Sequence, residues 1–142
     1  MAGTMPSDTL PTSPRYSAEP CEAHPSASVL AGMSVLILED EPLVAMFVES
    51  CLQDAGAAVV KIAASISAAR SVLNEPFDAA VIDLHVADGD ASPLIGVLSE
   101  RKIPVVVTKG GAIDRELLTQ TVAVLQKPYP EADLIKILAM VR

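Results

Sequence analysis

Acidic side chains follow two short apolar runs of this sequence, at the point where each run ends. Residues 35–38 lead into Glu39 and Asp40, and residues 79–82 lead into Asp83. Short apolar runs with polar boundaries are typical of buried strands in a parallel sheet. If these strands are neighbours, their acidic ends converge at one edge. Converging carboxylates repel one another unless a cation or a proton accompanies them, so this edge is the first candidate for a functional site.

Two later apolar runs would add a hydroxyl and an ammonium group to the same edge. Thr108 ends the run 103–108, and Lys127 with Pro128 follows the run 122–126. The carboxylates at this edge are oxygen ligands that suit Mg²⁺. One of them can also attack a phosphoryl group and form an aspartyl phosphate. A metal, a lysine and a hydroxyl can neutralise the equatorial oxygens during such a transfer. Phosphoryl chemistry is therefore the chemistry that this set of residues favours.

The elements that would position these residues alternate between strands and helices. The expected strands are 35–38, 58–63, 77–83, 103–108 and 122–126, and the expected helices are 42–55, 65–74, 92–100, 114–120 and 131–141. This alternation predicts an α/β fold with a doubly wound parallel sheet, right-handed crossovers and helices on both faces. Ligands of such sheets bind beyond the carboxyl ends of the strands. Residues 84–91 are expected to form a loop.

Composition sets the boundaries of the domain and excludes some classes of function. The chain has 142 residues and a net charge of −8, which suits one acidic domain and disfavours direct nucleic-acid binding. Residues 1–32 are rich in Pro and Ser and are expected to form a disordered tail, leaving 33–142 as the folded domain. Cys21 and Cys51 lack metal-site spacing. No membrane span or secretory signal is expected, so the predicted location is the cytoplasm.

The ordered series of strand ends resembles the receiver domain of bacterial two-component response regulators. The match consists of Glu39 and Asp40, then Asp83, then Thr108, then Lys127 followed by proline, and it covers the chain from Ser34 onward. The resemblance implies a flavodoxin-like (βα)5 fold with strand order 2-1-3-4-5. It also implies that the Lys127–Pro128 peptide bond is cis.

The resemblance implies a role for each site residue. Asp83 would accept a phosphoryl group from a phosphohistidine, and Thr108 and Lys127 would bind the phosphoryl oxygens. Mg²⁺ would be held by Glu39, Asp40, Asp83 and the backbone carbonyl of His85. The donor would be a sensor histidine kinase or a histidine phosphotransfer protein within a phosphorelay.

A receiver without an attached output domain would act through an unknown downstream protein, and a homodimer is left open. It would promote only its own phosphorylation and dephosphorylation, so it is not expected to be an enzyme with a separate substrate. Two alternatives remain. One is a pseudo-receiver that binds partners without phosphorylation. The other is a small Mg²⁺-dependent aspartyl phosphatase, which His85 disfavours because that class usually carries a second acid at this position.

Three residues depart from the usual receiver pattern. Val124 stands where many receivers carry an aromatic residue that moves with the threonine, so a different switching device is expected. Lys109 replaces a small residue and could crowd the phosphoryl site, assist it electrostatically or point to solvent. The His85 side chain could tune hydrolysis of the acyl phosphate, because histidine is the usual side chain for proton transfer near neutral pH, although its carbonyl is the expected contact.

Overall fold

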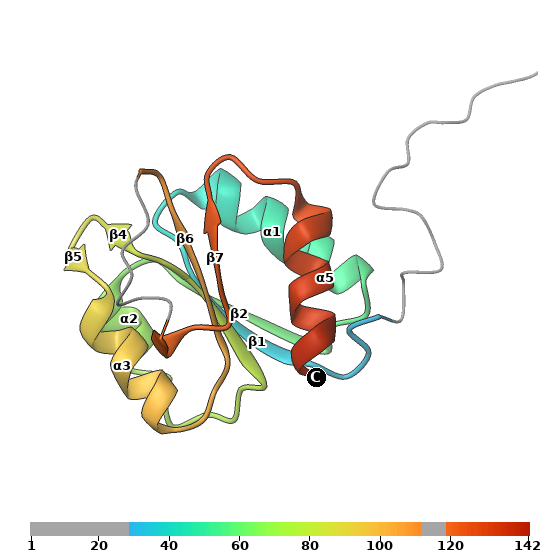
Figure 1. Cartoon of the computed structure of the whole chain (residues 1–142), viewed down its shortest axis with the longest axis horizontal. Helices are drawn as coiled ribbons and strands as arrows, with labels where there is room; N and C mark the ends of the chain where they lie inside the picture. The colour runs from blue at the N-terminus through green and yellow to red at the C-terminus, as the bar shows by residue number, and fades with distance from the viewer. Residues whose placement is uncertain (1–28, 112–118) are drawn as a thin grey trace, which may run out of the picture.

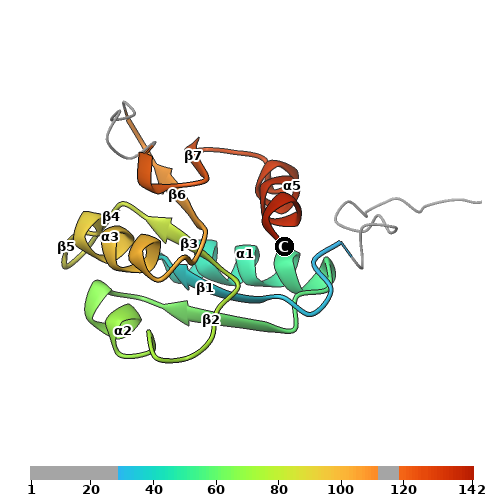
Figure 2. The same cartoon turned by 60° about the horizontal axis from the view of Figure 1, so that its bottom comes forward.

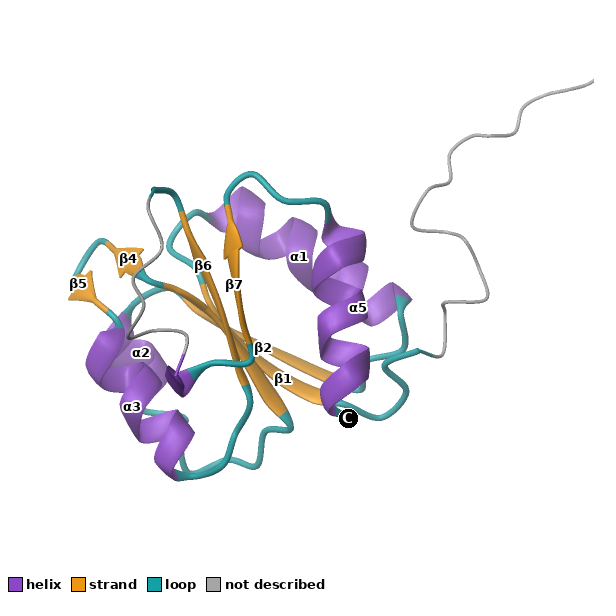
Figure 3. Ribbon diagram, viewed as in Figure 1, coloured by secondary structure: helices purple, strands orange, loops and turns teal. Residues whose placement is uncertain are grey.

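A five-stranded parallel sheet forms the centre of the molecule (Figure 1; Figure 3). The computed structural model describes residues 29–111 and 119–142. Along the sheet the strands follow the order β2-β1-β3-β6-β7, which is the predicted order 2-1-3-4-5 when only the sheet strands are counted. Their bounds are β1 Ser34–Leu38, β2 Val59–Ala63, β3 Ala79–Asp83, β6 Val105–Lys109 and β7 Ala123–Gln126. The predicted doubly wound α/β fold is confirmed.

Helices cover both faces of this sheet, as Figure 2 shows. They are α1 Pro42–Asp54, α2 Ile66–Arg70, α3 Ser92–Glu100 and α5 Glu131–Val141. Alternate residues of β1 divide between two cores. Leu36 packs with α2 and α3, whereas Ile37 packs with α1 and α5. Strands covered on both faces become apolar along their whole length, which explains the uninterrupted runs in the sequence. No helix in the described ranges is long and apolar enough to cross a membrane.

Local capping signals account for the helix ends. Pro42 begins α1, and Gly56 beyond its end has a positive φ of 105°, which a residue without a side chain adopts readily. Helix α2 is shorter than the predicted 65–74, because it ends at Arg70 and continues as turns. Of the predicted helix 114–120, Thr119 and Gln120 are helical and the remainder lies outside the described residues.

The segment preceding β1 is packed into the domain. The Leu30 side chain is fully buried, and its backbone N–H donates to the carbonyl of Ala55 at 2.8 Å. The Arg142 guanidinium donates to the carbonyls of Val29 and Ala31, both at 2.7 Å. The packed part of the chain thus already includes Val29, upstream of the predicted domain start at residue 33. The rest of the predicted tail, residues 1–28, lies outside the described residues.

Candidate functional site

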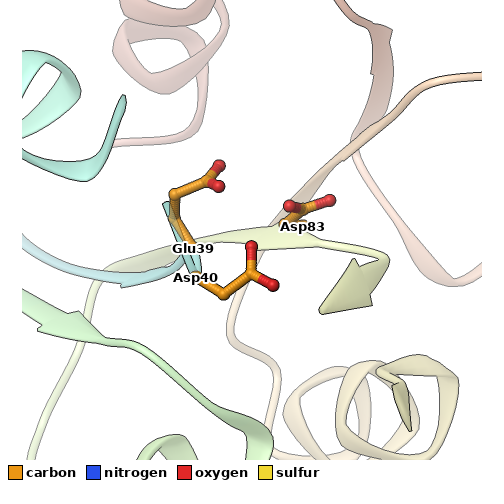
Figure 4. Close-up of side chains that lie close together, drawn as sticks. All are labelled: Glu39, Asp40 and Asp83. Atoms are coloured by element: carbon orange, nitrogen blue, oxygen red, sulfur yellow. The ribbon is translucent and has the colours of Figure 1, made fainter. Parts of the chain in front are cut away.

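Three carboxylates converge beyond the carboxyl ends of β1 and β3 (Figure 4). Glu39 and Asp40 follow β1 directly, and Asp83 is the last residue of β3. One oxygen from each side chain lies within 4.8 Å of the others. The register explains this convergence, because Leu38 pairs with Ile82 and brings the two strand ends level. The predicted cluster of acids therefore exists, and its oxygen-only donor set suits a hard cation such as Mg²⁺.

Lys127 holds two of these carboxylates. Its Nζ atom lies 3.0 Å from Oδ2 of Asp83 and 3.2 Å from Oε1 of Glu39. The lysine follows β7, and its own N–H donates to the carbonyl of Lys109 at 2.8 Å. The Lys127–Pro128 peptide bond is cis, as expected from the resemblance. An ammonium group thus already neutralises part of the charge that the acids share.

Burial opposes the charged forms of Glu39 and Lys127 at the site. The Glu39 and Asp83 side chains are only 7% and 9% exposed. Burial raises the pKa of Glu39, and the Asp83 charge adds to the increase, while the Glu41 N–H and the Lys127 ammonium oppose it. At Lys127 burial lowers the pKa, but the bonds and charges of Asp83 and then Glu39 outweigh it, so the net pKa is raised. The Lys127 ammonium therefore favours charged Glu39, whereas burial and the neighbouring Asp83 charge oppose it.

Thr108 lies beside Asp83 in the sheet. The two residues are directly paired in the β3–β6 register, and Thr108 is 2% exposed. This pairing places the hydroxyl-bearing residue at the same strand edge as the nucleophile candidate, as predicted. The next strand pair continues the arrangement, because Thr108 pairs with Leu125, two residues before Lys127. The sheet register thus brings together the four strand ends that the sequence singled out.

The predicted loop after Asp83 forms a small antiparallel ribbon. His85–Val86 is β4 and Gly89–Asp90 is β5, with His85 paired to Asp90. The ribbon was missed because its two-residue strands are too short to show a periodic pattern. The Asp88-Gly89 dipeptide was the available signal, since such pairs are frequent in hairpins. The His85 side chain is exposed, and its backbone enters the ribbon two residues after Asp83.

Lys109 does not point to solvent, because it is only 7% exposed at the end of β6. Its charge is among the influences that lower the pKa of Asp90, after the larger effects of the Ser92 hydroxyl and N–H. The Lys109 charge therefore acts on Asp90 in the ribbon that follows Asp83. Val124, the residue in place of the usual aromatic, is partly buried and packs against the α2–α3 core.

Comparison with known proteins agrees with this geometry at the level of the fold. No family model matches the sequence, and no curated protein matches it. Among solved structures, the receiver (CheY-like) domain from Methylobacillus flagellatus is 24% identical, covering 79% of this chain and 100% of that chain, with a TM-score of 0.70. The receiver domain of Francisella response regulator 1452 is 21% identical, covering 78% and 96%, with a TM-score of 0.69. A sensor protein from Polaromonas sp. is 28% identical, covering 77% and 94%, with a TM-score of 0.68.

The chain therefore has the fold of response regulator receiver domains. The resemblance carried by the strand-end residues is confirmed in this respect.

Proposed function

We propose that this protein is a phosphoacceptor of a two-component or phosphorelay pathway, with Asp83 as the residue that is phosphorylated. The observation that carries this proposal is the joint position of Asp83, two further acids and Lys127 at one strand edge. Asp83 is nearly buried, and the Lys127 ammonium contacts one of its oxygens at 3.0 Å. A carboxylate so placed is fixed in orientation while its charge is balanced.

In the proposed reaction, a carboxylate oxygen of Asp83 attacks the phosphorus of a phosphohistidine. The new O–P bond forms as the P–N bond breaks, and the imidazole nitrogen leaves with the electron pair and takes up a proton. Lys127 would stabilise the charge on one phosphoryl oxygen, and the Thr108 hydroxyl would donate to another. Hydrolysis of the acyl phosphate by water would return Asp83 to its carboxylate form.

Glu39, Asp40 and Asp83 are the residues that would hold Mg²⁺. The fit rests on their donor atoms, since all are carboxylate oxygens within 4.8 Å of one another. The carbonyl of His85 is the further ligand that the resemblance implies. When bound, Mg²⁺ would supply positive charge for the phosphoryl oxygens in addition to that of the Lys127 ammonium.

The proposed phosphoryl donor is a sensor histidine kinase or a histidine phosphotransfer protein, and an apolar groove beside the site supports this partner. The groove measures about 540 Å³ and runs from α1 to the start of α5, with Leu43, Phe47, Lys127 and Tyr129 in its lining. Leu43 and Phe47 are 81% and 51% exposed. Because Lys127 belongs both to the groove and to the site, a protein that brings a phosphohistidine to Asp83 could contact this groove at the same time. An apolar helical surface around that histidine is the complementary partner.

The proposal is tested by incubating the purified protein with acetyl phosphate and Mg²⁺ and recording its intact mass. A gain of one phosphoryl group that Asp83→Asn abolishes is expected. No gain in a protein that demonstrably binds Mg²⁺ would contradict the proposal and favour the pseudo-receiver alternative. The downstream partner is proposed to be another protein that distinguishes the phosphorylated state.

A further inference from the structure

The ribbon that follows Asp83 is too small to hold its own shape. It contains two residue pairs, His85 with Asp90 and Val86 with Gly89. Longer two-stranded hairpins are already marginal in water, so a ribbon of this size needs outside support. At its base the support is backbone, because the Leu84 N–H donates to the Thr108 carbonyl at 3.0 Å and the Ala91 N–H donates to the Leu84 carbonyl at 2.8 Å.

The tip of the ribbon is supported by Asp88. Its two carboxylate oxygens accept the backbone N–H groups of Ile66 at 3.0 Å and Ser67 at 3.3 Å. These are the first two residues of α2, whose N–H groups have no partner within the helix. The third N–H, that of Ala68, donates to Ser65 Oγ at 3.0 Å. Asp88 and Ser65 therefore both cap the start of α2, and of these two residues Asp88 is the one that belongs to the ribbon.

The side of the ribbon that leads back to α3 has a separate attachment. Oδ1 of Asp90 accepts the backbone N–H of Ser92 at 2.7 Å, at the start of α3. The Val86 side chain is buried in the core shared with α2 and α3. Beside these attachments, the two hydrogen bonds of Asp88 join the tip of the ribbon to the start of α2. Since His85 opens the ribbon and pairs across it, motion of the tip would displace the His85 backbone.

We propose that Asp88 is a positioning residue for the metal site, which fixes the backbone of His85 by tying the ribbon to the start of α2. This inference rests on the proposed function, in which the His85 carbonyl is a ligand of Mg²⁺. Coupling of this kind is reciprocal. A bound cation that fixes His85 would also tighten the bonds from Asp88 to Ile66 and Ser67. Binding of the cation at the site would then change the environment of the Ile66 and Ser67 amides at the start of α2.

The experiment compares the full-length wild type with Asp88→Ala, Asp88→Asn and Ser65→Ala. Mg²⁺ affinity is measured by calorimetry, and the backbone amide resonances of Ile66 and Ser67 are followed by NMR during the titration. Asp88→Ala is expected to weaken Mg²⁺ binding about tenfold, which is typical for loss of a group that orients a metal ligand. Asp88→Asn keeps one acceptor oxygen and is expected to recover most of the affinity.

Ser65→Ala is the matched control, because it removes a cap of the same helix without touching the ribbon. It is expected to leave Mg²⁺ affinity within about twofold of wild type, well below the effect of losing an orienting group. In the wild type the Ile66 and Ser67 amides are expected to shift with Mg²⁺, and Asp88→Ala is expected to abolish this response. If Asp88→Ala does not fold, Asp88→Ser replaces it, since the shorter side chain cannot bridge both amides.

Equal Mg²⁺ affinity in the wild type and Asp88→Ala would overturn the inference while leaving the proposed function intact. An equal loss in Ser65→Ala would also overturn it, since the effect would then come from the helix alone. Failure of the wild type to bind Mg²⁺ would instead contradict the proposed function itself.

Discussion

The Nζ atom of Lys127 lies 3.0 Å from Oδ2 of Asp83, although the two residues are 44 positions apart in the sequence. The same Nζ atom lies 3.2 Å from Oε1 of Glu39. One ammonium group therefore occupies the space between two nearly buried carboxylates, where a divalent cation would also be attracted. Lys127 therefore stabilises the charged acids, and it would compete with a bound metal for their oxygens.

Replacing Lys127 by Met separates these two effects. The free energy of unfolding without metal is expected to fall by about 1–3 kcal/mol, because two buried carboxylates lose a partner that is itself 31% exposed. Mg²⁺ affinity is expected to stay equal or to rise, because the competing cation is gone. Phosphorylation by acetyl phosphate is expected to slow. Urea unfolding with and without Mg²⁺, together with calorimetry, measures these changes.

Lys61→Met provides the matched control for this variant. Lys61 pairs with Glu75 at 3.3 Å, but these side chains are 41% and 40% exposed. Loss of such an exposed pair is expected to cost about 0.5 kcal/mol or less and to leave Mg²⁺ affinity unchanged. A clear fall in Mg²⁺ affinity for Lys127→Met would show that Lys127 assists the metal rather than competing with it.

Thr108→Val tests the proposed hydroxyl contact with the phosphoryl group. Valine has nearly the same shape and suits a buried strand, so the fold and Mg²⁺ affinity are expected to persist. The rate of phosphorylation by acetyl phosphate is expected to fall on the order of 10- to 100-fold, because one donor to the developing charge is lost. Phosphorylation at the wild-type rate, followed by intact mass against time, would rule out this role for Thr108.

Asp90 makes the protein sensitive to acid. Hydrogen bonds from the hydroxyl and then the backbone N–H of Ser92 lower its pKa below the ordinary 3.8. A carboxylate with a lowered folded-state pKa contributes stability above its unfolded pKa and loses it as the pH falls through the folded value. The wild type should therefore lose more unfolding free energy below pH 3.8 than Asp90→Asn, which keeps an acceptor for Ser92 but does not titrate. Parallel pH curves for the two proteins would disprove the assignment.

The groove between α1 and α5 is tested by a charge on its rim. Leu43→Asp is expected to slow phosphotransfer from the most active histidine kinase of the same organism by about tenfold, because the aspartate would have to be desolvated against an apolar partner. Acetyl phosphate is too small to need the groove, so its reaction should be unchanged. Met140→Asp is the control, since Met140 is comparably exposed at 77% but does not line the groove. Equal effects of the two variants would argue against docking at this rim.

The parts of the fold that could be predicted from the sequence are those with strong local signals. The first four residues of β3 and the first three of β6 are all apolar because both faces of the sheet are covered, and Pro42 and Ser65 mark helix starts. The strand-end residues could be placed at one edge because parallel strands share a direction. Their mutual contacts depend on register, which an alternating apolar and polar pattern would specify, and strands buried on both faces lack that alternation.

The features that the sequence did not predict depend on contacts between distant segments. The hydrogen bond from Ile66 at the start of α2 to Asp88 joins residues 22 positions apart, and no periodic pattern in the sequence predicts it. Burial of Lys109 was left open because a lysine at a strand end is usually solvated, whereas here it lies near the ribbon. The short length of α2 also escaped prediction, since the residues after Arg70 form turns despite their helical composition.

The central claim is that Asp83, rather than Glu39 or Asp40, carries the phosphoryl group. Borohydride reduces an aspartyl phosphate to homoserine, so treatment of the acetyl phosphate-labelled protein followed by peptide mass spectrometry locates the modified residue. The structure predicts homoserine at position 83 alone, dependent on Mg²⁺. Reduction at Glu39 or Asp40, or none at all in protein that binds Mg²⁺, would contradict the account.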